Sequence, residues 1–331
     1  MNEPRGVGSA RRAGRTARRT ARRSRRAPLA PREGLDPVRW RVPAGTDGDA
    51  RTVLASRFPP LLDPGATPLA DRFAAGEIVR ADGTAWTAAD RVRAGEEFWF
   101  HRELRPEQVP DVELPVLLHD EHLLVVDKPP GMATMPRGEH ILASALVRLR
   151  RSTGCHDLSP LHRLDRATAG VLLFGVRSEE RAAYQELFAR REVHKTYRAL
   201  VDLTEVASGS LWRTGKRFVL RDRLEKRRGE LRTRVVPGEP DAITAVHVLE
   251  ERAGPTRLLE LHPRTGRTHQ LRAQLAAAGA PIRGDELYPV PREVPAPEGD
   301  LHLLALSVCF TDPVTGEVRE LVSRRDPRLG T

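Results

Sequence analysis

The chain has 331 residues, of which 39% are hydrophobic and 30% are charged, so it can form a packed core in one large domain or two smaller ones. Two cysteines exclude a disulfide framework and a Cys-rich zinc site, and no apolar run is long enough to cross a bilayer. The formal net charge of +10 is concentrated in residues 1–35, where 11 arginines accompany two carboxylates. The remainder is therefore nearly neutral, and the high isoelectric point does not indicate a basic face on the folded part.

The N-terminal residues 1–35 are rich in Arg, Ala, Gly and Pro and contain few large apolar side chains. This composition predicts disorder, because the segment cannot bury enough apolar surface to offset the entropy lost on folding. An arm that binds phosphates non-specifically and a solubilising tail are both compatible with it. Residues 36–50, rich in Pro, Gly and Asp, are predicted to be a linker.

Residues 51–104 are predicted to form a small module. Short helices are expected at 52–58 and 69–73, separated by prolines, followed by a hairpin at 76–86 with an Asp-Gly turn and a strand at 93–100. This order resembles the alpha-L RNA-binding fold of a small-subunit ribosomal protein. The two helices lack the dense basic face of such domains, so a degenerate packing module is equally compatible. A Pro-punctuated linker follows at 105–115.

Residues 116–325 are predicted to form the main domain. Apolar runs bounded by turn residues predict strands at 123–128, 196–201, 243–249, 258–262 and 303–310. Helices are expected at 142–149, from a Ser178 cap to Arg191, and from the 265–272 stretch to Gly279. Residues 209–238 fit either a β-ribbon or a substrate-facing insertion. The strands outnumber the helices and do not alternate with them, which indicates an α+β fold.

The stretch that stands out is Leu161 to Gly170, which reads LHRLDRATAG and precedes the apolar run 171–176. Asp165 is its one carboxylate among His162, Arg163 and Arg166. A carboxylate at the mouth of a buried strand, surrounded by cations, is a candidate catalytic group on a rigid support. A salt-bridged structural loop is the alternative.

Two further stretches, KTYRA at 195–199 and TGRTHQLR at 265–272, also place charge beside a strand or helix start. If the three converge, they supply one carboxylate, an aromatic ring and several guanidinium groups. A single carboxylate disfavours ordinary sugar hydrolysis, which uses two. The ring can stack on a base and the guanidinium groups can bind phosphate, so the set indicates attack on a nucleotide held out of its helix.

Other kinds of site lack their motifs. The sequence has no phosphate-binding Walker loop, no dinucleotide-binding glycine pattern and no nucleophile elbow. His119 with His122, and His262 with His269, lack further metal ligands at suitable spacing. We therefore expect neither a metal nor a small-molecule cofactor.

The three motifs in this order resemble the RluA-type branch of the pseudouridine synthases. HRLDRATAG is similar to the branch's catalytic H-R-L-D-x-x-T-S-G, KTYRALV to its second motif and TGRTHQLR to its third, while LLVVDKPPGM resembles the strand that opens the catalytic domain. The resemblance covers about residues 115–325. It implies a mixed, mostly antiparallel sheet flanked by helices, and isomerisation of uridine to pseudouridine in structured ribosomal or transfer RNA without cofactor or metal.

The resemblance also implies residue roles. Asp165 matches the catalytic aspartate, which acts on the anomeric carbon or the base, or helps to form a glycal intermediate. Tyr197 matches the ring that stacks on the flipped uracil, and Arg272 matches the basic partner of the aspartate. Leu271 matches the apolar residue under the base, and Arg163 the side chain that fills the gap in the RNA.

We count His162 and Arg267 with the substrate-binding residues. Two positions depart from the family pattern: Ala169 stands where serine is usual, and Met135-Pro136 where His-Pro is usual. The first departure should affect loop packing, and the second substrate contacts.

Two other functions compete with the isomerase. An RNA-binding or ribosome-assembly factor could have kept the fold without catalysis, and a base-excision glycosylase would also flip a base but would admit water and release free uracil. We expect RNA as the partner, no membrane association, a monomer, and a cytoplasmic location.

Overall fold

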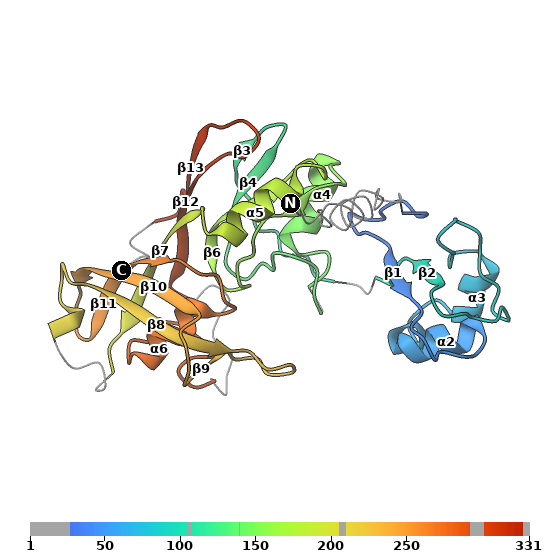
Figure 1. The fold of residues 1–331 in the computed structure, drawn as a ribbon, viewed down its shortest axis with the longest axis horizontal. Helices are drawn as coiled ribbons and strands as arrows, with labels where there is room; N and C mark the ends of the chain where they lie inside the picture. Colours follow the sequence, from blue (N-terminus) through green and yellow to red (C-terminus); the bar gives the residue numbers. More distant parts are fainter. Residues whose placement is uncertain (1–26, 105–106, 139, 205–209, 292–300, 327–331) are drawn as a thin grey trace, which may run out of the picture. The chain divides into compact units, whose positions relative to one another are not determined.

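The computed structural model describes residues 27–104, 107–138, 140–204, 210–291 and 301–326. The chain divides into two compact units, Met1–Arg105 and Pro106–Thr331 (Figure 1). Most of the predicted disordered tail, residues 1–26, lies outside the described residues. Within the described ranges, no helix combines the length and the apolar composition that a membrane span requires.

The first unit is a small module with an aromatic core. It contains β1 (Val38–Arg41), α2 (Ala50–Arg57), the 3-10 turn η1 (Pro59–Leu62), α3 (Leu69–Ala74) and β2 (Glu97–Phe100). Strands β1 and β2 pair antiparallel, so a strand lies inside the predicted linker 36–50. The predicted hairpin at 76–86 is a turn closed by the Val79–Ala85 bridge, without a longer ladder. Stacked rings of Trp40, Phe98 and Trp86 fill the core.

The second unit is built on one large sheet. Its strands are β3 (Val116–His119), β4 (Leu123–Lys128), β5 (Ser159–Pro160), β6 (Ala169–Gly175), β7 (His194–Asp202), β8 (Arg217–Glu225), β9 (Arg234–Val236), β10 (Ala242–Glu251), β11 (Thr256–Pro263), β12 (Leu303–Thr311) and β13 (Val318–Val322). Its helices are α4 (Ala145–Thr153), α5 (Arg181–Arg190) and α6 (Gln270–Ala277), with the 3-10 turn η3 (Ser210–Trp212).

The sheet order is β3-β4-β6-β12-β7-β11-β10-β8-β9, with β13 beside β12 and β5 beside β6. Among the strand pairs of the described residues, only β6 and β12 run parallel. The predicted α+β class with a mixed, mostly antiparallel sheet is confirmed. Within the described part of the 209–238 segment, β8 and β9 pair as a ribbon over 217–236, which confirms the predicted β-ribbon.

Alternate residues of β4 and β6 are buried under helices on opposite faces of the sheet. Leu124 and Leu172 pack with α4, whereas Leu123 and Leu173 pack with Tyr184 of α5. In the other half, Leu271 and Leu275 of α6 pack against β7, β10 and β11. This burial on both faces explains why the fully buried segments 123–126 and 171–174 are apolar at every position.

The two halves join where β6 meets β12, and Gly170 makes this approach possible. Its φ is +113°, and a Cβ atom built there would lie 2.2 Å from the carbonyl oxygen of Ala305. Any other residue would force β12 away, so the glycine that ends the LHRLDRATAG stretch is required by packing.

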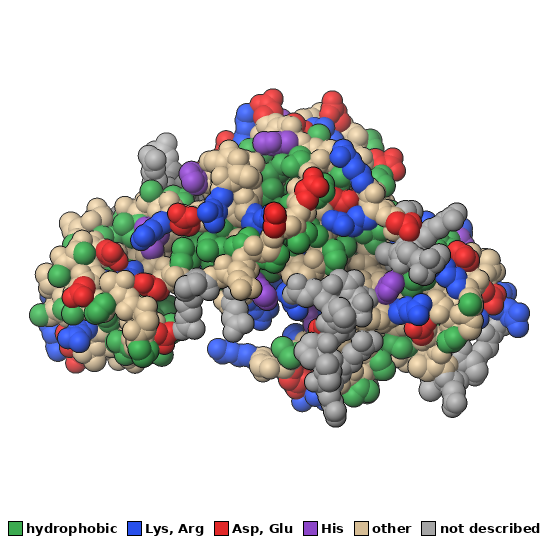
Figure 2. Space-filling view, turned by 180° about the vertical axis from the view of Figure 1, so that it is seen from behind, with side chains coloured by type: hydrophobic (Ala, Val, Ile, Leu, Met, Phe, Trp, Pro, Cys, Tyr) green, Lys and Arg blue, Asp and Glu red, His purple; other side chains and the backbone are tan. Residues whose placement is uncertain are grey.

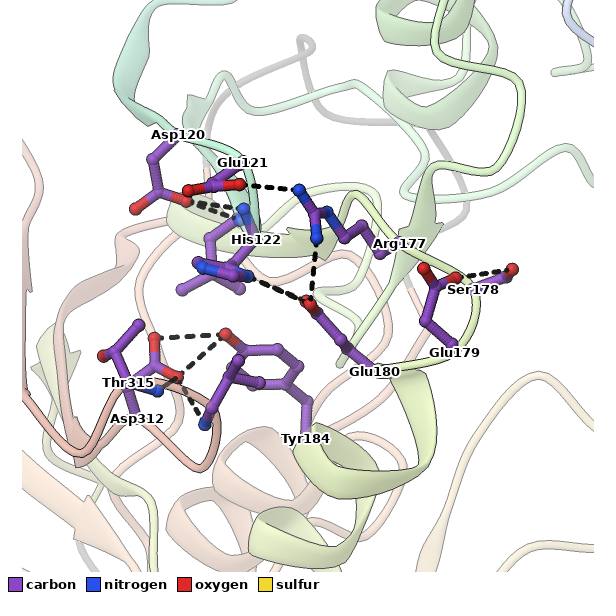
Figure 3. A network of polar contacts seen from close by, with 12 residues as sticks. Asp120, Glu121, His122, Arg177, Ser178, Glu179, Glu180, Tyr184, Asp312 and Thr315 are labelled. Carbon is purple, nitrogen blue, oxygen red and sulfur yellow. Dashed lines mark hydrogen bonds and ion pairs between the residues drawn. The ribbon is translucent and has the colours of Figure 1, made fainter.

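A polar network fixes helix α5 against neighbouring turns (Figure 3). His122 bonds Glu180 through Nδ1 at 3.0 Å, and the Tyr184 hydroxyl donates to Asp312 at 3.0 Å. The predicted Ser178 cap is wrong: its hydroxyl donates to the Glu179 carboxylate, and the helix begins at Arg181. The turn at Asp312 leads into β13, which the sequence did not predict.

The surface shows no single basic region on the face that Figure 2 presents. Blue and red side chains alternate across it, around a central group of hydrophobic side chains (Figure 2). This mixture agrees with the near-neutral charge of the chain beyond residue 35. Binding of a polyanion by the second unit therefore depends on local groups of cations, such as those at the cavity described next.

Candidate active site

A cavity of about 630 Å³ opens between the loop before β6, strand β7 and the start of α6. Side chains from three separate stretches of sequence line it together. They include all seven predicted site residues: His162, Arg163, Asp165, Tyr197, Arg267, Leu271 and Arg272. The structure therefore brings the three motifs to one cavity, which meets the condition on which the sequence analysis joined them.

Asp165 lies on a loop that is fixed by its own backbone. The amide of Thr168 donates to the Asp165 carbonyl at 3.1 Å. The Thr134 hydroxyl donates to the Leu164 carbonyl at 2.8 Å and accepts from the Leu164 amide at 3.1 Å. Because the backbone is held, the carboxylate can stay 22% exposed to the cavity and still keep a defined position.

Lys128, at the end of β4, ties this loop to the turn after the strand. Its buried Nζ donates to the carbonyls of Pro129 and Met132 at 2.8 Å and of Arg166 at 3.1 Å. Burial lowers the pKa of Lys128 to about 7, although the charge of Asp165 opposes the shift. Three carbonyl acceptors match the three N–H donors of an ammonium group, so the contacts favour the charged form.

Arg272, in the first turn of α6, is held mainly by Asp285 rather than by Asp165. Its Nε and Nη2 donate to the two carboxylate oxygens of Asp285 at 2.7 Å each. Its Nη1 lies 3.5 Å from Oδ2 of Asp165. Burial alone would lower the pKa of Arg272, but the bonds to Asp285 outweigh burial and raise it. The predicted pairing with Asp165 is thus present as the weaker of two contacts.

His269 is a neighbour of Asp165 that the sequence did not assign to the site. It sits in the left-handed region at φ 53°, just before α6, with Nε2 3.8 Å from Oδ2 of Asp165. Its Nδ1 lies 3.2 Å from the Tyr288 hydroxyl, which itself bonds the backbone of Thr233. Burial lowers the pKa of His269, which favours a neutral ring.

Tyr197 and Leu271 supply the apolar walls near Asp165. Tyr197 packs between the two core clusters on either side of β7, and Leu271 is 7% exposed. Burial raises the pKa of Tyr197, and the charge of Asp165 adds to the rise. The side chain is therefore a neutral phenol at physiological pH, which suits a stacking face.

Arg163 and Arg267 lie at the exposed edge of the cavity. Arg163 projects from the loop of Asp165 and is exposed. The Nη2 of Arg267 bonds Asp241 at 2.8 Å, with 54% of its side chain exposed. The amide of Arg267 donates to the Gln270 side chain, which also accepts from the Thr265 hydroxyl, so this turn is well fixed.

His162 uses its ring within the protein. Nε2 accepts the backbone N–H of Leu173 at 3.2 Å, and the ring stacks on Phe188 with centroids 5.4 Å apart. A nitrogen that accepts a hydrogen bond carries no proton, and burial lowers the pKa of His162 to about 3. The ring borders the cavity, but these contacts favour support of the loop over direct substrate binding.

This geometry predicts an acid-sensitive fold. Below its ordinary pKa of 6.5, His162 takes up a proton in the unfolded chain, whereas the folded protein resists it down to about pH 3. The free energy of unfolding should therefore fall as the pH falls through this window, by at most about 1.4 kcal/mol per pH unit from this residue. His162→Gln keeps an acceptor for the Leu173 amide. In this variant the free energy of unfolding, measured by urea titration at a series of pH values, should depend less steeply on pH. The exposed His156→Gln control should keep the wild-type slope, and an equal slope in both variants would contradict the assignment.

The histidines that were considered as metal ligands are engaged elsewhere. His122 bonds Glu180, His262 bonds Glu260 and His269 bonds Tyr288. Among the residues that the structure describes, no group of three or more His, Cys, Asp or Glu side chains could hold a metal ion.

Comparison with known proteins finds a family whose members resemble the part of this chain that contains the three motifs of the cavity. The family described as RNA pseudouridylate synthase matches residues 122–277. The dual-specificity RNA pseudouridine synthase RluA of Haemophilus influenzae is 32% identical over 223 residues, which cover 64% of this chain and 94% of that protein.

Two further relatives act on different RNAs according to their names. The ribosomal large subunit pseudouridine synthase D of Xylella fastidiosa is 32% identical over 75% of this chain and 73% of its own. The tRNA pseudouridine synthase C of Vibrio cholerae is 34% identical over 53% of this chain and 74% of its own. Among solved structures, human RNA pseudouridylate synthase domain containing 1 shares the fold, with a TM-score of 0.52 and 24% identity over 67% of this chain and 86% of that one.

Proposed function

The chain belongs to the RluA-type RNA pseudouridine synthases, enzymes that isomerise uridine to pseudouridine in RNA, and we propose that the cavity around Asp165 is its active site. The observation that carries this proposal is the meeting of Asp165, Tyr197 and Arg272 in one cavity. The fixed backbone around Asp165 supports it further, since a catalytic group needs a defined position.

In this site Asp165 acts on the target nucleotide, at the anomeric carbon or the base, or by helping to form a glycal. The N1–C1′ bond breaks, the base turns, and a C5–C1′ bond forms while the C5 proton leaves and N1 gains a proton. No electrons are lost or gained, so the reaction needs neither oxidant nor reductant, and we propose that it proceeds without metal or cofactor. Arg272, held by Asp285, keeps a fixed positive charge 3.5 Å from the carboxylate throughout.

The other cavity residues position the base. Tyr197 stacks on the extruded uracil, an interaction worth roughly 1–3 kcal/mol per base, and Leu271 packs beneath it. Arg163, at the mouth of the cavity, fills the gap that the nucleotide leaves in the RNA and so offsets part of the cost of extrusion, on the order of a few kcal/mol. Arg267, at the exposed edge of the cavity, contacts the RNA near Arg163. His162 supports the loop of Asp165.

The substrate that we propose is structured ribosomal or transfer RNA, the two classes that the names of the relatives give for those proteins. We further propose a monomer that works in the cytoplasm. The described part of the N-terminal unit, residues 27–104, carries ten arginines and twelve carboxylates. This balance favours a degenerate alpha-L-like packing module over a basic RNA-binding one.

Mapping pseudouridines in RNA tests the proposal. Ribosomal and transfer RNA from a strain without this protein should lack one or more pseudouridines, and the purified full chain should restore them in vitro. At least one missing pseudouridine should be restored in ribosomal or transfer RNA. If no uridine is converted although the RNA still binds, the protein is a non-catalytic binding factor. Release of free uracil instead of pseudouridine would identify a glycosylase.

A further inference from the structure

The cavity extends beyond Asp165 to the end of helix α5 and the start of β7. Phe188, Arg191 and Val193 form the wall there, and Lys195 projects from β7. Lys195 and Tyr197 are two residues apart on one strand, so they share a face, roughly 7 Å apart along it. A nucleotide whose base stacks on Tyr197 therefore places its sugar and phosphate within reach of Lys195.

Lys195 is a partly buried cation without a carboxylate partner among the described residues. Its Nζ lies 3.4 Å from the carbonyl oxygen of Thr265, a long contact for an ammonium group. Burial lowers the pKa of Lys195, with no neighbouring carboxylate to oppose the shift. Lys128, by comparison, has three carbonyl acceptors at 2.8–3.1 Å. Lys195 thus keeps unused donors beside open space.

The charge of the cavity favours an anion at this end. Two carboxylates line it, and both have cationic partners: Asp165 with Arg272, and Asp241 with Arg267. Six cations line it: Arg163, Arg191, Lys195, Arg264, Arg267 and Arg272. Four cations remain without one of these carboxylates: Arg163 on the loop of Asp165, and Lys195, Arg191 and Arg264.

We propose that Lys195 binds a backbone phosphate next to the target uridine while Tyr197 stacks on the uracil, and so sets the register of the RNA in the cavity. This assignment rests on the proposed active site and deepens it. A phosphate fits better than a uracil carbonyl, because a doubly bonded neutral oxygen would not neutralise the excess charge of this wall. Arg191 and Arg264, which are more exposed, add long-range attraction at the rim.

The test asks whether removal of the Lys195 charge and removal of one phosphate charge have the same, non-additive effect on KM. A synthetic RNA hairpin that carries a mapped target uridine is made with a single neutral methylphosphonate linkage, either 5′ or 3′ to that uridine. One of the two linkages should raise the KM of the wild type about tenfold or more, the loss expected for one charge-assisted bond. Lys195→Met should raise KM on the unmodified hairpin by a similar factor, and the same linkage should then cost nothing further.

Direct binding, which needs no turnover, provides a second readout. The slope of log Kd against log salt concentration should decrease by about 0.7–0.9 in Lys195→Met, as for one lost phosphate contact. Lys195→Arg should restore both the slope and KM. As a matched control, Arg177→Met removes a positive charge that pairs with Glu121 outside the cavity, and it should change neither.

Two outcomes would overturn the proposal. If Lys195→Met lowers kcat with an unchanged salt slope and Lys195→Arg gives no rescue, the lysine only supports the Thr265 turn. If the methylphosphonate still weakens binding to Lys195→Met by the full factor, another residue binds that phosphate. Failure of the proposed active site would be seen separately, as absence of pseudouridine from wild-type reactions in which the hairpin still binds.

Discussion

Asp165→Asn should abolish pseudouridine formation, with a loss of about 10⁴-fold or more in kcat, the scale seen when the central group of a catalytic set is removed. Asparagine has the same shape but neither the negative charge nor the nucleophilic oxygen. The fold should remain, because Arg272 keeps its two bonds to Asp285 and the loop is held by backbone contacts. Turnover is measured by mass spectrometry of nucleosides released from the RNA.

The control for this variant is Asp157→Asn, an exposed carboxylate that precedes β5 outside the cavity. It should turn over like the wild type, and both variants should bind the RNA with similar affinity. Near-normal product formation by Asp165→Asn would show that the chemistry resides elsewhere. Loss of RNA binding together with activity would instead indicate a damaged cavity.

Hydrophobic periodicity predicted most of the large sheet, because buried strands leave a signal in the sequence itself. The segments 123–126 and 171–174 are apolar on both faces because α4 and α5 cover them from opposite sides. The pattern does not reveal edge strands. The β13 sequence VRELV has three residues that are exposed and only one that is buried, so pairing with β12 is what makes it a strand.

The motifs predicted which residues meet at the site, but not the buried groups that hold them. Asp285 lies beyond the three motifs, and a short GDELYP segment looks like an ordinary turn. Its full burial against Arg272 depends on the packing of α6 against the following loop. For Lys128 the sequence predicts only the end of a strand, because its three carbonyl partners are brought together by the folded backbone.

Asp285 changes how the charge at the site is understood. A guanidinium with Asp165 as its sole partner would form hydrogen bonds to both oxygens of that carboxylate. Those bonds would make the carboxylate a weaker nucleophile. Bidentate bonds to Asp285 fix the Arg272 fork in one plane and leave only Nη1 facing Asp165, at 3.5 Å. The arrangement keeps the positive charge close to Asp165 while leaving its oxygens available to a substrate.

Asp285→Asn should therefore reduce both stability and rate. The amide has one acceptor oxygen and presents N–H donors to a guanidinium, so Arg272 keeps at most one of its two bonds. Breaking a buried ion pair costs about 3–5 kcal/mol in the free energy of unfolding. Arg272 should then turn toward Asp165, and kcat should fall about 10- to 100-fold, as for a misplaced catalytic group. Urea unfolding and single-turnover kinetics measure the two effects.

Glu186→Gln serves as the matched control, because it also breaks one carboxylate–arginine pair, with Arg190 on α5. Both of these side chains are about 60% exposed, so the loss should stay below about 1 kcal/mol with unchanged turnover. Arg272→Lys separates charge from geometry: it keeps the cation but cannot bond both oxygens of Asp285, and it should also be slow. If Asp285→Asn unfolds like the wild type and retains its kcat, then the direct contact between Arg272 and Asp165 is sufficient to hold the arginine, and Asp285 has no part in positioning it.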